Sequence, residues 1–550
     1  MKKTLLFALL LLCTTFIFAQ SDVWLWARKA GGTQDDKVYS IDIDSSGNSY
    51  VTGYFKGTAS FGTTTLTSIG NWDIFVAKLD SSGNWLWAKQ AGGTDYDCGY
   101  DIATDSSGNS YVTGCFQGTA SFGSTTLTSY GGYDIFVAKL DSSGNWLWAK
   151  KAGGTSPDYG YDIAIDSSGN SYVTGYFYST ASFGDITLTS SGDYDIFVAK
   201  LDNSGNWLWA HKAGGPNEDY GYSIATDSSG NSYVTGYFKG TASFESTNLT
   251  SSGDRDIFVA KLNSYGSWLW AKKAGGTNRD GGCGIATDSS GNSYITGYFE
   301  GAASFGGSNL TSSGWYDIFV AKLNSIGNWL WAKKAGGIDW DEGCGIATDS
   351  SGNSYVTGYF MGTASFGTTN LTSSGGYDIF IAKLDSNGNW LDLQKAGGTN
   401  SDSGCGIATD SSGNTYLTGY FRETAYFGDI NLTSSGNQDI FVAKAHIPYD
   451  SNDLVVVEET TELGAIYPNP FNPVANIPYN LSEISNADFY IYNAKGQLVH
   501  HINVGPQHPG YYQISWNGKD TNGKSCGSGI YYFIMKAGKQ TFQRKAVLMK

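Results

Sequence analysis

Short runs of apolar residues recur every 61 residues along most of this chain, separated by stretches rich in Gly, Asn, Asp and Ser. Three of the recurring segments are typified by residues 49–55, 102–105 and 134–139. The fourth is a Trp-Leu-Trp strand that begins at Trp24, Trp85, Trp146, Trp207, Trp268 and Trp329, with a degenerate copy at Trp390. All are rich in β-branched and aromatic residues, so the pattern predicts four short antiparallel strands in every repeat.

The alternation within one strand indicates how the predicted sheets are covered. In residues 74–79, Ile74 and Val76 fall on one face, whereas Phe75, Ala77 and Leu79 fall on the other. Both faces are apolar, so each four-stranded sheet needs a neighbour on both sides. Identical sheets stacked around an axis meet this need and leave few exposed edges, which predicts a β-propeller.

The number of repeats and the place of the first strand predict how this propeller closes. The segments typified by residues 102–105 and 134–139 each occur seven times, and no Trp-Leu-Trp strand follows the last copy at 439–444. The chain instead has an unpaired strand of this type at Trp24. We therefore predict an all-β, seven-bladed propeller over residues 22–445, closed by pairing of the N-terminal strand with the blade at 405–444.

The repeat resembles a known bacterial family. Residues 99–114 read Gly-Tyr-Asp-Ile-Ala-Thr-Asp-Ser-Ser-Gly-Asn-Ser-Tyr-Val-Thr-Gly, and residues 134–145 read Asp-Ile-Phe-Val-Ala-Lys-Leu-Asp-Ser-Ser-Gly-Asn. Recurring in phase over residues 22–445, this pattern is similar to the SBBP beta-propeller repeat family. The resemblance implies a propeller in a secreted or cell-surface setting, and it implies no enzymatic activity.

Residues 1–19 have the pattern of a secretory signal peptide. Lys2 and Lys3 precede an apolar run at residues 5–12, and Ala19 is a small residue before Gln20. Cys13 leaves lipidation as an alternative, which the preceding Leu12 disfavours. The apolar run is too short for a transmembrane span, and no later stretch is apolar enough for one. We expect a mature chain without a transmembrane segment, secreted or held at the outer cell surface.

The 61-residue period ends near residue 445. Residues 446–465 read as an acidic linker that carries Asp450, Asp453, Glu458, Glu459 and Glu462. Short alternating segments follow at 487–492, 497–501, 512–516, 530–536 and 540–548. Such strands, punctuated by glycines, predict a small Ig-like β-sandwich over residues 466–550.

This C-terminal segment resembles the sorting domains of type IX secretion and the related flagellar-hook-capping Ig-like domain. The residues that match this sorting motif are Tyr467, Pro468, Asn469, Pro470, Gly496, Gly529 and Tyr531. The resemblance implies passage across the outer membrane, with the outer-membrane secretion machinery as partner. The alternative is an Ig-like tail with a structural role only.

The charge and the cysteines narrow the possible partners. The net charge is −16, so the chain offers no basic surface for nucleic acid. Cys283, Cys344 and Cys405 share one repeat position with Tyr39, Tyr100, Tyr161 and Tyr222, which is typical of a packing site. No Cys-x-x-Cys and no Cys/His cluster occurs, so we predict neither a metal site nor a cofactor.

Two repeated features invite a functional interpretation. One interpretation of the seven carboxylates of Asp44 and its equivalents is a calcium or sugar site. The sequence Asp-Ser-Ser-Gly-Asn around each of them instead favours a role in capping the turn. The Trp-Leu-Trp strands suggest a sugar platform, yet their period-2 pattern favours packing between blades. Repeats differ most after Ala-Gly-Gly, so a ligand site is predicted on this variable rim, at Tyr96, Tyr220, Asp339, Trp340, Asp341 and Glu342.

Three functions fit these patterns. The first is a non-catalytic recognition or adhesion propeller for a glycan or surface protein, and no catalytic residue is predicted for it. The second is an extracellular enzyme acting on polysaccharide, with Asp339, Asp341 and Glu342 as acid and base. The third is a structural surface-layer component. The near-uniform repeat favours the first, because an active site breaks repeat symmetry.

Overall fold

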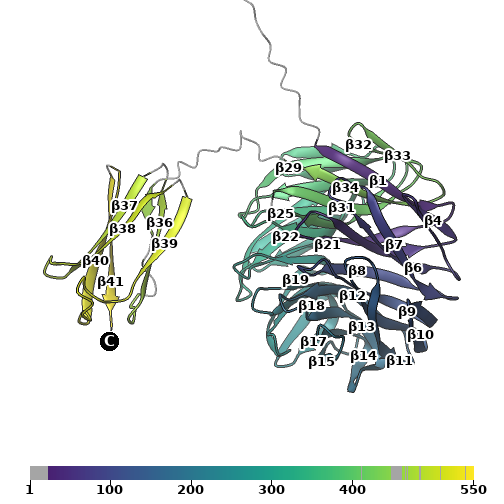
Figure 1. Cartoon of the computed structure of the whole chain (residues 1–550), viewed down its shortest axis with the longest axis horizontal. Helices are drawn as coiled ribbons and strands as arrows, with labels where there is room; N and C mark the ends of the chain where they lie inside the picture. Colours follow the sequence, from purple (N-terminus) through teal and green to yellow (C-terminus); the bar gives the residue numbers. More distant parts are fainter. Residues whose placement is uncertain are drawn as a thin grey trace, which may run out of the picture. The chain divides into compact units, whose positions relative to one another are not determined.

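The computed structural model describes residues 23–410, 412–447, 461–464, 466, 469–481, 485–507, 510–538 and 540–549. Within these ranges the chain forms strands and no helix, in two compact units that divide after residue 448 (Figure 1). The all-β prediction is confirmed. The predicted signal peptide and residues 448–460 and 465 of the predicted linker lie outside the described residues. In the described part, no helix is long and apolar enough to cross a membrane.

The first unit repeats one sheet of four antiparallel strands. In its first copy, β2 (Lys37–Ile43), β3 (Ser49–Phe55), β6 (Asp73–Leu79) and β7 (Trp85–Gly93) pair in this order. Short turns join β2 to β3 and β6 to β7, so both turns lie at the same end of the sheet. These are the four strands that the 61-residue repeat predicts.

The following copies keep this order from inner to outer strand. They are β8 (Cys98–Thr104), β9 (Ser110–Phe122), β10 (Thr125–Leu140), β11 (Trp146–Gly154); β12 (Asp158–Ile165), β13 (Ser171–Phe183), β14 (Ile186–Leu201), β15 (Trp207–Ala213); and β16 (Asp219–Thr226), β17 (Ser232–Phe244), β18 (Thr247–Leu262), β19 (Trp268–Gly276). Then come β20 (Gly281–Thr287), β21 (Ser293–Phe305), β22 (Ser308–Leu323), β23 (Trp329–Gly336); and β24 (Glu342–Thr348), β25 (Ser354–Phe360), β28 (Asp378–Leu384), β29 (Trp390–Gly398).

The last copy takes its outer strand from the other end of the chain. β30 (Ser403–Thr409), β31 (Asn414–Phe421) and β34 (Asp439–His446) are consecutive, and β34 then pairs antiparallel with β1 (Trp24–Gly32). The indole of Trp24 packs edge-on against Phe427, with ring centroids 5.1 Å apart. The first and last strands of this unit therefore lie side by side (Figure 1).

Between the second and third strands of each copy, a hairpin arm pairs with the outer strand of the preceding copy. In three copies the arm forms separate short strands, which are β4 (Thr58–Phe61), β5 (Thr64–Thr67), β26 (Thr363–Phe366), β27 (Thr369–Thr372), β32 (Thr424–Phe427) and β33 (Ile430–Thr433). In the other four copies the arm is part of the two longer strands that it connects. Gly92 and Gly93 at the end of β7 pair with the arm in β9. A Cβ on Gly93 would lie 1.9 Å from the Thr119 carbonyl oxygen, so the Ala-Gly-Gly repeat reflects this close approach.

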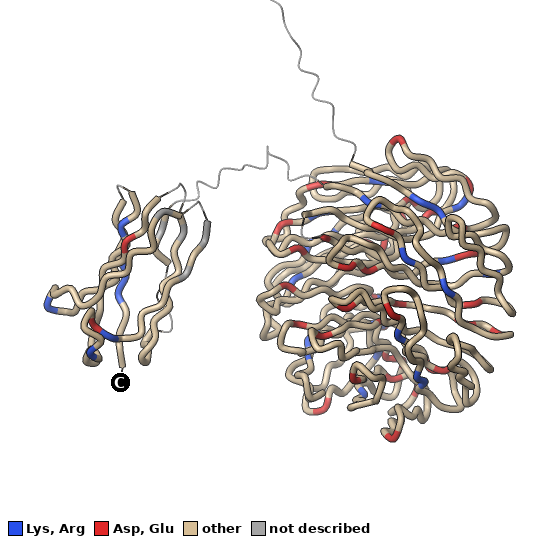
Figure 2. Tube along the Cα trace, viewed as in Figure 1, with Lys and Arg blue, Asp and Glu red and all other residues tan. Residues whose placement is uncertain are grey.

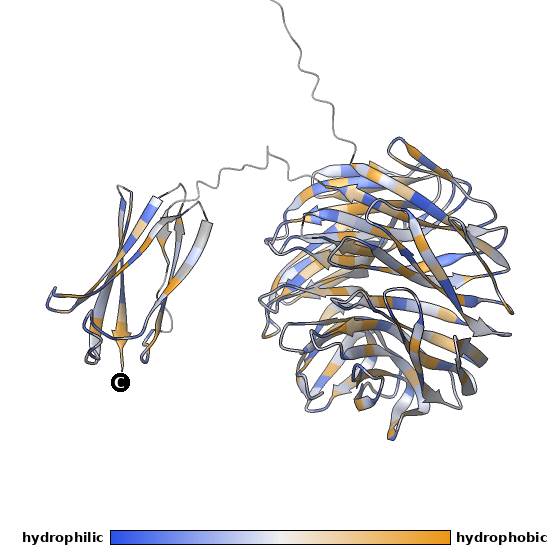
Figure 3. Cartoon of the chain, in the orientation of Figure 1, coloured by the Kyte–Doolittle hydropathy of each residue, from blue (hydrophilic) through white to orange (hydrophobic). Residues whose placement is uncertain are grey.

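The core of this unit lies between neighbouring sheets. Ile74 and Val76 pack with Val112 of the next sheet, whereas Phe75 and Ala77 pack on the other face, in a cluster with residues of β1, β31 and β34. All are fully buried, which confirms the prediction of two covered faces. Apolar positions accordingly recur along successive strands of the sheets (Figure 3).

The second unit is a β-sandwich. One sheet has the order β35 (Glu462–Leu463), β36 (Ala475–Leu481), β39 (Gly510–Trp516), and the other β38 (Leu498–Gln507), β37 (Ser485–Asn493), β40 (Gly529–Ala537), β41 (Gln540–Leu548). Phe471, Trp516 and Phe533 belong to the buried core between them. The sequence analysis predicts β37 to β41 and omits β35 and β36. In β36, Pro478 is a poor strand residue.

Candidate functional site

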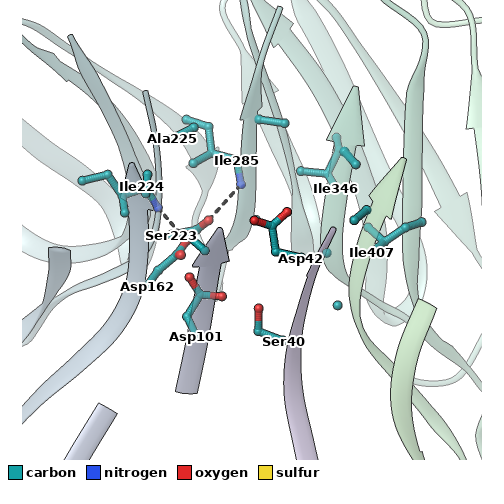
Figure 4. A pocket seen from close by; sticks show the side chains of 18 of the residues that line it. Ser40, Asp42, Asp101, Asp162, Ser223, Ile224, Ala225, Ile285, Ile346 and Ile407 are labelled. Carbon is teal, nitrogen blue, oxygen red and sulfur yellow. Dashed lines mark hydrogen bonds between the residues drawn. The ribbon is translucent and has the colours of Figure 1, made fainter. Parts of the chain in front are cut away.

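A channel of about 520 Å³ runs along the inner strands of the repeat unit. Its wall is formed by β2, β8, β12, β16, β20, β24 and β30. Each strand contributes five consecutive residues at equivalent repeat positions, beginning at Tyr39 in β2. Figure 4 shows part of this wall, with Asp42, Asp101 and Asp162 around the channel.

One side of the channel is polar. The Ile163 N–H donates to Oδ2 of Asp101 (2.8 Å), and the Ile224 N–H donates to Oδ2 of Asp162 (2.7 Å). Burial and the neighbouring Asp162 raise the pKa of Asp101 well above its ordinary value. Asp42 accepts hydrogen bonds from both the N–H and the hydroxyl of Thr104 at 2.7 Å. These carboxyls connect neighbouring inner strands, so they have a structural role.

The opposite side of the channel is lined by glycine. Gly284, Gly345 and Gly406 stand at the position that Asp101 and Asp162 occupy on the polar side. A Cβ on Gly284 would lie 3.1 Å from the carbonyl oxygen of the next inner strand. The channel is therefore asymmetric, although the strands that form it are nearly identical.

One mouth of the channel carries a row of tyrosines. Tyr39, Tyr100, Tyr161 and Tyr222 follow one another on successive inner strands, with ring centroids 5.4, 4.9 and 5.3 Å apart. Cys283, Cys344 and Cys405 complete this set and are partly exposed. The position predicted as a packing site thus borders the channel, and its aromatic part is confined to four strands.

Tyr96 and Tyr220, both predicted on the variable rim, belong to separate aromatic clusters at this end. Tyr96 packs edge-on against Trp72 (5.0 Å), which stacks on Tyr54 (4.3 Å). Tyr220 stacks on Tyr176 at 3.9 Å, and burial raises its pKa to about 12. These tyrosines extend the aromatic surface outward from the channel mouth.

Trp340 of the predicted rim forms the most exposed aromatic cluster. Its ring lies 6.4 Å from Trp315 and 5.4 Å from Tyr316, both in β22. The Trp315 and Trp340 side chains are 60% and 46% exposed. The sequence analysis missed Trp315 and Tyr316, since it searched only after Ala-Gly-Gly. A signal exists for Trp315, because tryptophan occurs at its repeat position in one copy only, whereas the position of Tyr316 is aromatic in several copies.

The predicted rim carboxylates do not form one exposed group. Asp341 is fully buried, and its oxygens accept the N–H groups of Gly337 (2.6 Å) and Met361 (3.0 Å). This corrects its placement on the rim, because the same aspartate recurs in every copy as a structural residue. Glu342 accepts hydrogen bonds from Tyr359 (2.6 Å) and Cys283, and burial raises its pKa. Asp339 is partly exposed.

At the other end of the sheets, the turn between the first two strands has the same sequence, Asp-Ser-Ser-Gly-Asn, in every copy. Oδ1 of Asp44 accepts the N–H groups of Ser46 (2.9 Å) and Asn48 (3.0 Å), which confirms the predicted turn-capping role. Although burial acts to raise the pKa of Asp44, these hydrogen bonds and one from Tyr50 hold it below the usual range. Variation between copies is thus concentrated at the end that carries Tyr39, Tyr96, Tyr220, Trp315, Tyr316 and Trp340, here called the aromatic face.

The residues of the predicted sorting motif have structural contacts where they are described. Asn469 accepts a hydrogen bond from the Val547 N–H (3.0 Å), and the Tyr531 hydroxyl donates to the Gly527 carbonyl (2.7 Å). Gly496 has a positive φ of 74° in a turn. Pro470 and Gly529 are exposed. Tyr467 and Pro468 lie outside the described residues.

In the part of the chain that the structure describes, the charged side chains are dispersed. Among the described residues no three His, Cys, Asp or Glu side chains come together as a metal site would need. Lysines and arginines are interspersed with acidic residues along the trace (Figure 2). The aromatic face is therefore the feature of this unit that departs most from the repeat.

Comparison with known families finds two kinds of module. The SBBP beta-propeller repeat matches residues 25–54, 86–114, 147–176 and 208–237, and the FlgD Ig-like domain matches residues 474–541. The chain therefore contains SBBP beta-propeller repeats followed by a FlgD Ig-like domain.

Two curated proteins are similar over parts of their length. An uncharacterized WD repeat-containing protein, L264 of Acanthamoeba polyphaga mimivirus, is 25% identical over 75% of this chain and 37% of its own length. The regulatory protein FlaEY of Caulobacter vibrioides is 28% identical over 46% of this chain and 29% of its own. The chain thus spans about a third of the length of these relatives.

Solved structures give only distant likenesses. PorZ, a surface component of the type-IX secretion system of Porphyromonas gingivalis, has a TM-score of 0.23 and 12% identity, over 93% of this chain and 74% of PorZ. A fungal alcohol oxidase of the AA5 family, in complex with copper, has a TM-score of 0.38 and 12% identity, over 96% of this chain and 99% of its own. At such scores neither fold nor activity follows from the likeness.

Proposed function

We propose that this chain is an exported, non-catalytic recognition protein whose propeller binds a carbohydrate on its aromatic face. The observation that carries the proposal is the exposed cluster of Trp315, Trp340 and Tyr316 at the variable end of the repeats. Indole and phenol rings stack on the apolar faces of sugar rings and present large rigid surfaces. A surface protein as ligand is the alternative for the same face.

A closed, seven-bladed ring is part of this proposal. The pairing of β1 with β34 supports it, because that pairing joins the first strand to the last sheet. The channel supports the blade count, since equivalent residues of β2, β8, β12, β16, β20, β24 and β30 border it. A closed ring would hold the aromatic face on a rigid support.

The non-catalytic part of the proposal rests on how the acidic side chains are used. Asp341 is held by two backbone N–H groups, and Glu342 by Tyr359 and Cys283. An inverting or retaining glycosidase needs two carboxyl groups free to face the substrate. Their engagement favours recognition over the polysaccharide-acting alternative. An exposed pair of tryptophans at one place only among the repeats is likewise unexpected for a uniform surface-layer component.

For the C-terminal sandwich we propose a sorting or anchoring role. The match to a FlgD Ig-like domain and the resemblance of its motif to type IX sorting domains support this role. The outer-membrane secretion machinery would then be its partner, with the chain released or kept at the outer cell surface. Removal of residues 466–550 should leave the protein in the periplasm of its own cell, as fractionation and immunoblotting would show.

Binding of the full chain to soluble and insoluble polysaccharides, with product analysis of the same samples, tests the central proposal. We expect one polysaccharide class to bind without cleavage, and the variants Trp315→Ala and Trp340→Ala to weaken binding at least about tenfold each, as for loss of one stacked ring. Tyr265→Ala is the matched control, because Tyr265 is 82% exposed in a turn at the opposite end.

Three results would overturn the proposal. Cleavage of the bound polysaccharide that Glu342→Gln abolishes would make the protein an enzyme. Equal loss of binding in Tyr265→Ala would remove the assignment to the aromatic face. Absence of binding to every polysaccharide, with ordered self-assembly of the pure chain, would favour a structural role.

A further inference from the structure

Cys98 and Cys115 face each other across two paired strands. Cys98 in β8 is the cross-strand partner of Cys115 in β9, and both side chains are buried. Directly opposed residues in an antiparallel pair have Cα atoms about 4.5–5.5 Å apart, a separation that a disulfide bridges. The two thiols are near enough to interact, since burial and then the neighbouring Cys115 raise the pKa of Cys98.

The repeat shows how unusual this pair is. The two equivalent positions hold, in the other copies, Lys37 and Tyr54, Tyr159 and Tyr176, Tyr220 and Tyr237, Gly281 and Tyr298, Glu342 and Tyr359, and Ser403 and Tyr420. Tyrosine is thus replaced at the second position only where the facing residue is also cysteine. A packing role alone would be met by tyrosine, so the paired change indicates that the two sulfur atoms act together.

We propose that Cys98 and Cys115 form a disulfide bond in the folded protein. A small-molecule disulfide such as oxidised glutathione is the oxidant. The thiolate of one cysteine attacks this disulfide, forming a mixed disulfide and releasing one glutathione thiolate. The second cysteine then attacks the mixed disulfide, so the Sγ–Sγ bond forms and a second glutathione leaves. Two thiol protons and two electrons pass to the two glutathione molecules.

The surroundings indicate when this bond forms and what it holds. Burial raises the pKa of Cys98, so the reactive thiolate is scarce once the sheet is packed. The bond therefore forms while β8 and β9 are still accessible and is then protected from reductants. Cys115 Sγ lies 3.6 Å from the Tyr100 hydroxyl, next to the tyrosines of the channel mouth. The crosslink would fix β8 and β9 where they support this part of the aromatic face.

Peptide mapping of the full chain tests the bond directly. The chain is purified reduced, refolded with oxidised and reduced glutathione, denatured in an alkylating agent and digested without reductant. We expect a peptide that joins Cys98 to Cys115, whereas Cys283, Cys344, Cys405 and Cys526 are alkylated. Full alkylation of Cys98 and Cys115, or a bond from either to another cysteine, would overturn the proposal.

A stability measurement keeps the test independent of the digest. Cys115→Tyr restores the residue that the other copies carry and removes the bond. The wild-type chain refolded in reductant should have a Tm a few degrees below that of the chain refolded with glutathione, whereas the two conditions should give the same Tm for Cys115→Tyr. An equal shift in both proteins, or no shift in the wild type, would contradict the proposed bond.

Discussion

A buried aspartate at the start of each inner strand holds two backbone segments together. In the second copy, Oδ2 of Asp97 accepts the Gly93 N–H (2.7 Å) and Oδ1 accepts the Gln117 N–H (3.2 Å). Gly93 ends the outer strand of the first copy, and Gln117 lies in β9 where the hairpin arm begins. The aspartate therefore fixes the junction between two sheets. Its equivalents are Asp36, Asp158, Asp219, Asp280, Asp341 and Asp402.

Replacing this side chain should destabilise the repeat unit. Asp97→Ala leaves two backbone N–H groups without acceptors in a buried place, and each such group costs about 1–3 kcal/mol. We expect the free energy of unfolding to fall by about 2–5 kcal/mol, measured by urea denaturation of the full chain. Asp95→Ala is the control, since Asp95 accepts only a long hydrogen bond from Thr94 (3.4 Å). Equal midpoints for the two variants would refute this role.

Single residues differ in how far their roles can be predicted from the sequence. The role of Asp44 is predictable, because its partners Ser46 and Asn48 lie within four residues and define a turn. Asp341 was misplaced because one of its partners, Met361, is 20 residues away and becomes a neighbour only through strand pairing. Trp315 was missed because its neighbour Trp340 comes from another strand connection.

At the level of strands, β1 offers a direct test of the joint between the two ends of the repeat unit. Trp24 is buried against Phe427, whereas the next residue, Leu25, is 49% exposed. Trp24→Ala should lower the free energy of unfolding by about 3–5 kcal/mol, as for other buried aromatic residues. Leu25→Ala should cost less than about 1 kcal/mol. Urea denaturation of both variants measures the difference.

Hydrogen exchange locates the effect of the Trp24→Ala change. If β1 covers the edge of β34, backbone amides near Ala443 and Ala445 should exchange faster in Trp24→Ala than in Leu25→Ala. Unchanged exchange in β34, together with equal stabilities, would mean that β1 does not hold the last sheet in solution.

The strands were predictable where the alternation of apolar residues at every second position coincides with the 61-residue repeat. Alternation every second residue defines each strand, and the 61-residue period confirms it in copy after copy. The C-terminal sandwich has no second period, so β36 with its Pro478 was not recognised. The asymmetric channel was not predictable either, because Asp42 and Asp162 become its lining only after strands from separate copies are assembled.

Across the whole repeat unit, the junction aspartates share an unusual titration. Burial raises the pKa of Asp36, Asp97, Asp158, Asp219, Asp280 and Asp402 to about 7, and of Asp341 to about 6, although backbone hydrogen bonds act in the opposite direction. The ordinary value for an unfolded aspartate is about 4. The folded protein therefore binds more protons than the unfolded chain between about pH 4 and pH 7.

This difference fixes the sign of the pH dependence. The stability that a raised carboxyl pKa contributes is present below the unfolded value and is lost as the pH rises through the folded value, so the propeller should unfold at a lower temperature at pH 8 than at pH 5. Turn aspartates such as Asp44, whose pKa is lowered, lose their contribution to stability only below about pH 4.

Calorimetry at pH 5, 6, 7 and 8 in buffers of different ionisation enthalpy measures both the shift in Tm and the number of protons released on unfolding. Asp97→Asn removes one such group, so it should reduce the proton release at pH 6, whereas Asp44→Asn, which removes a carboxyl with a lowered pKa, should not. A Tm that rises from pH 5 to pH 8 would show that these buried carboxyls are ionised in the folded protein and are stabilised by their backbone hydrogen bonds more than burial disfavours them.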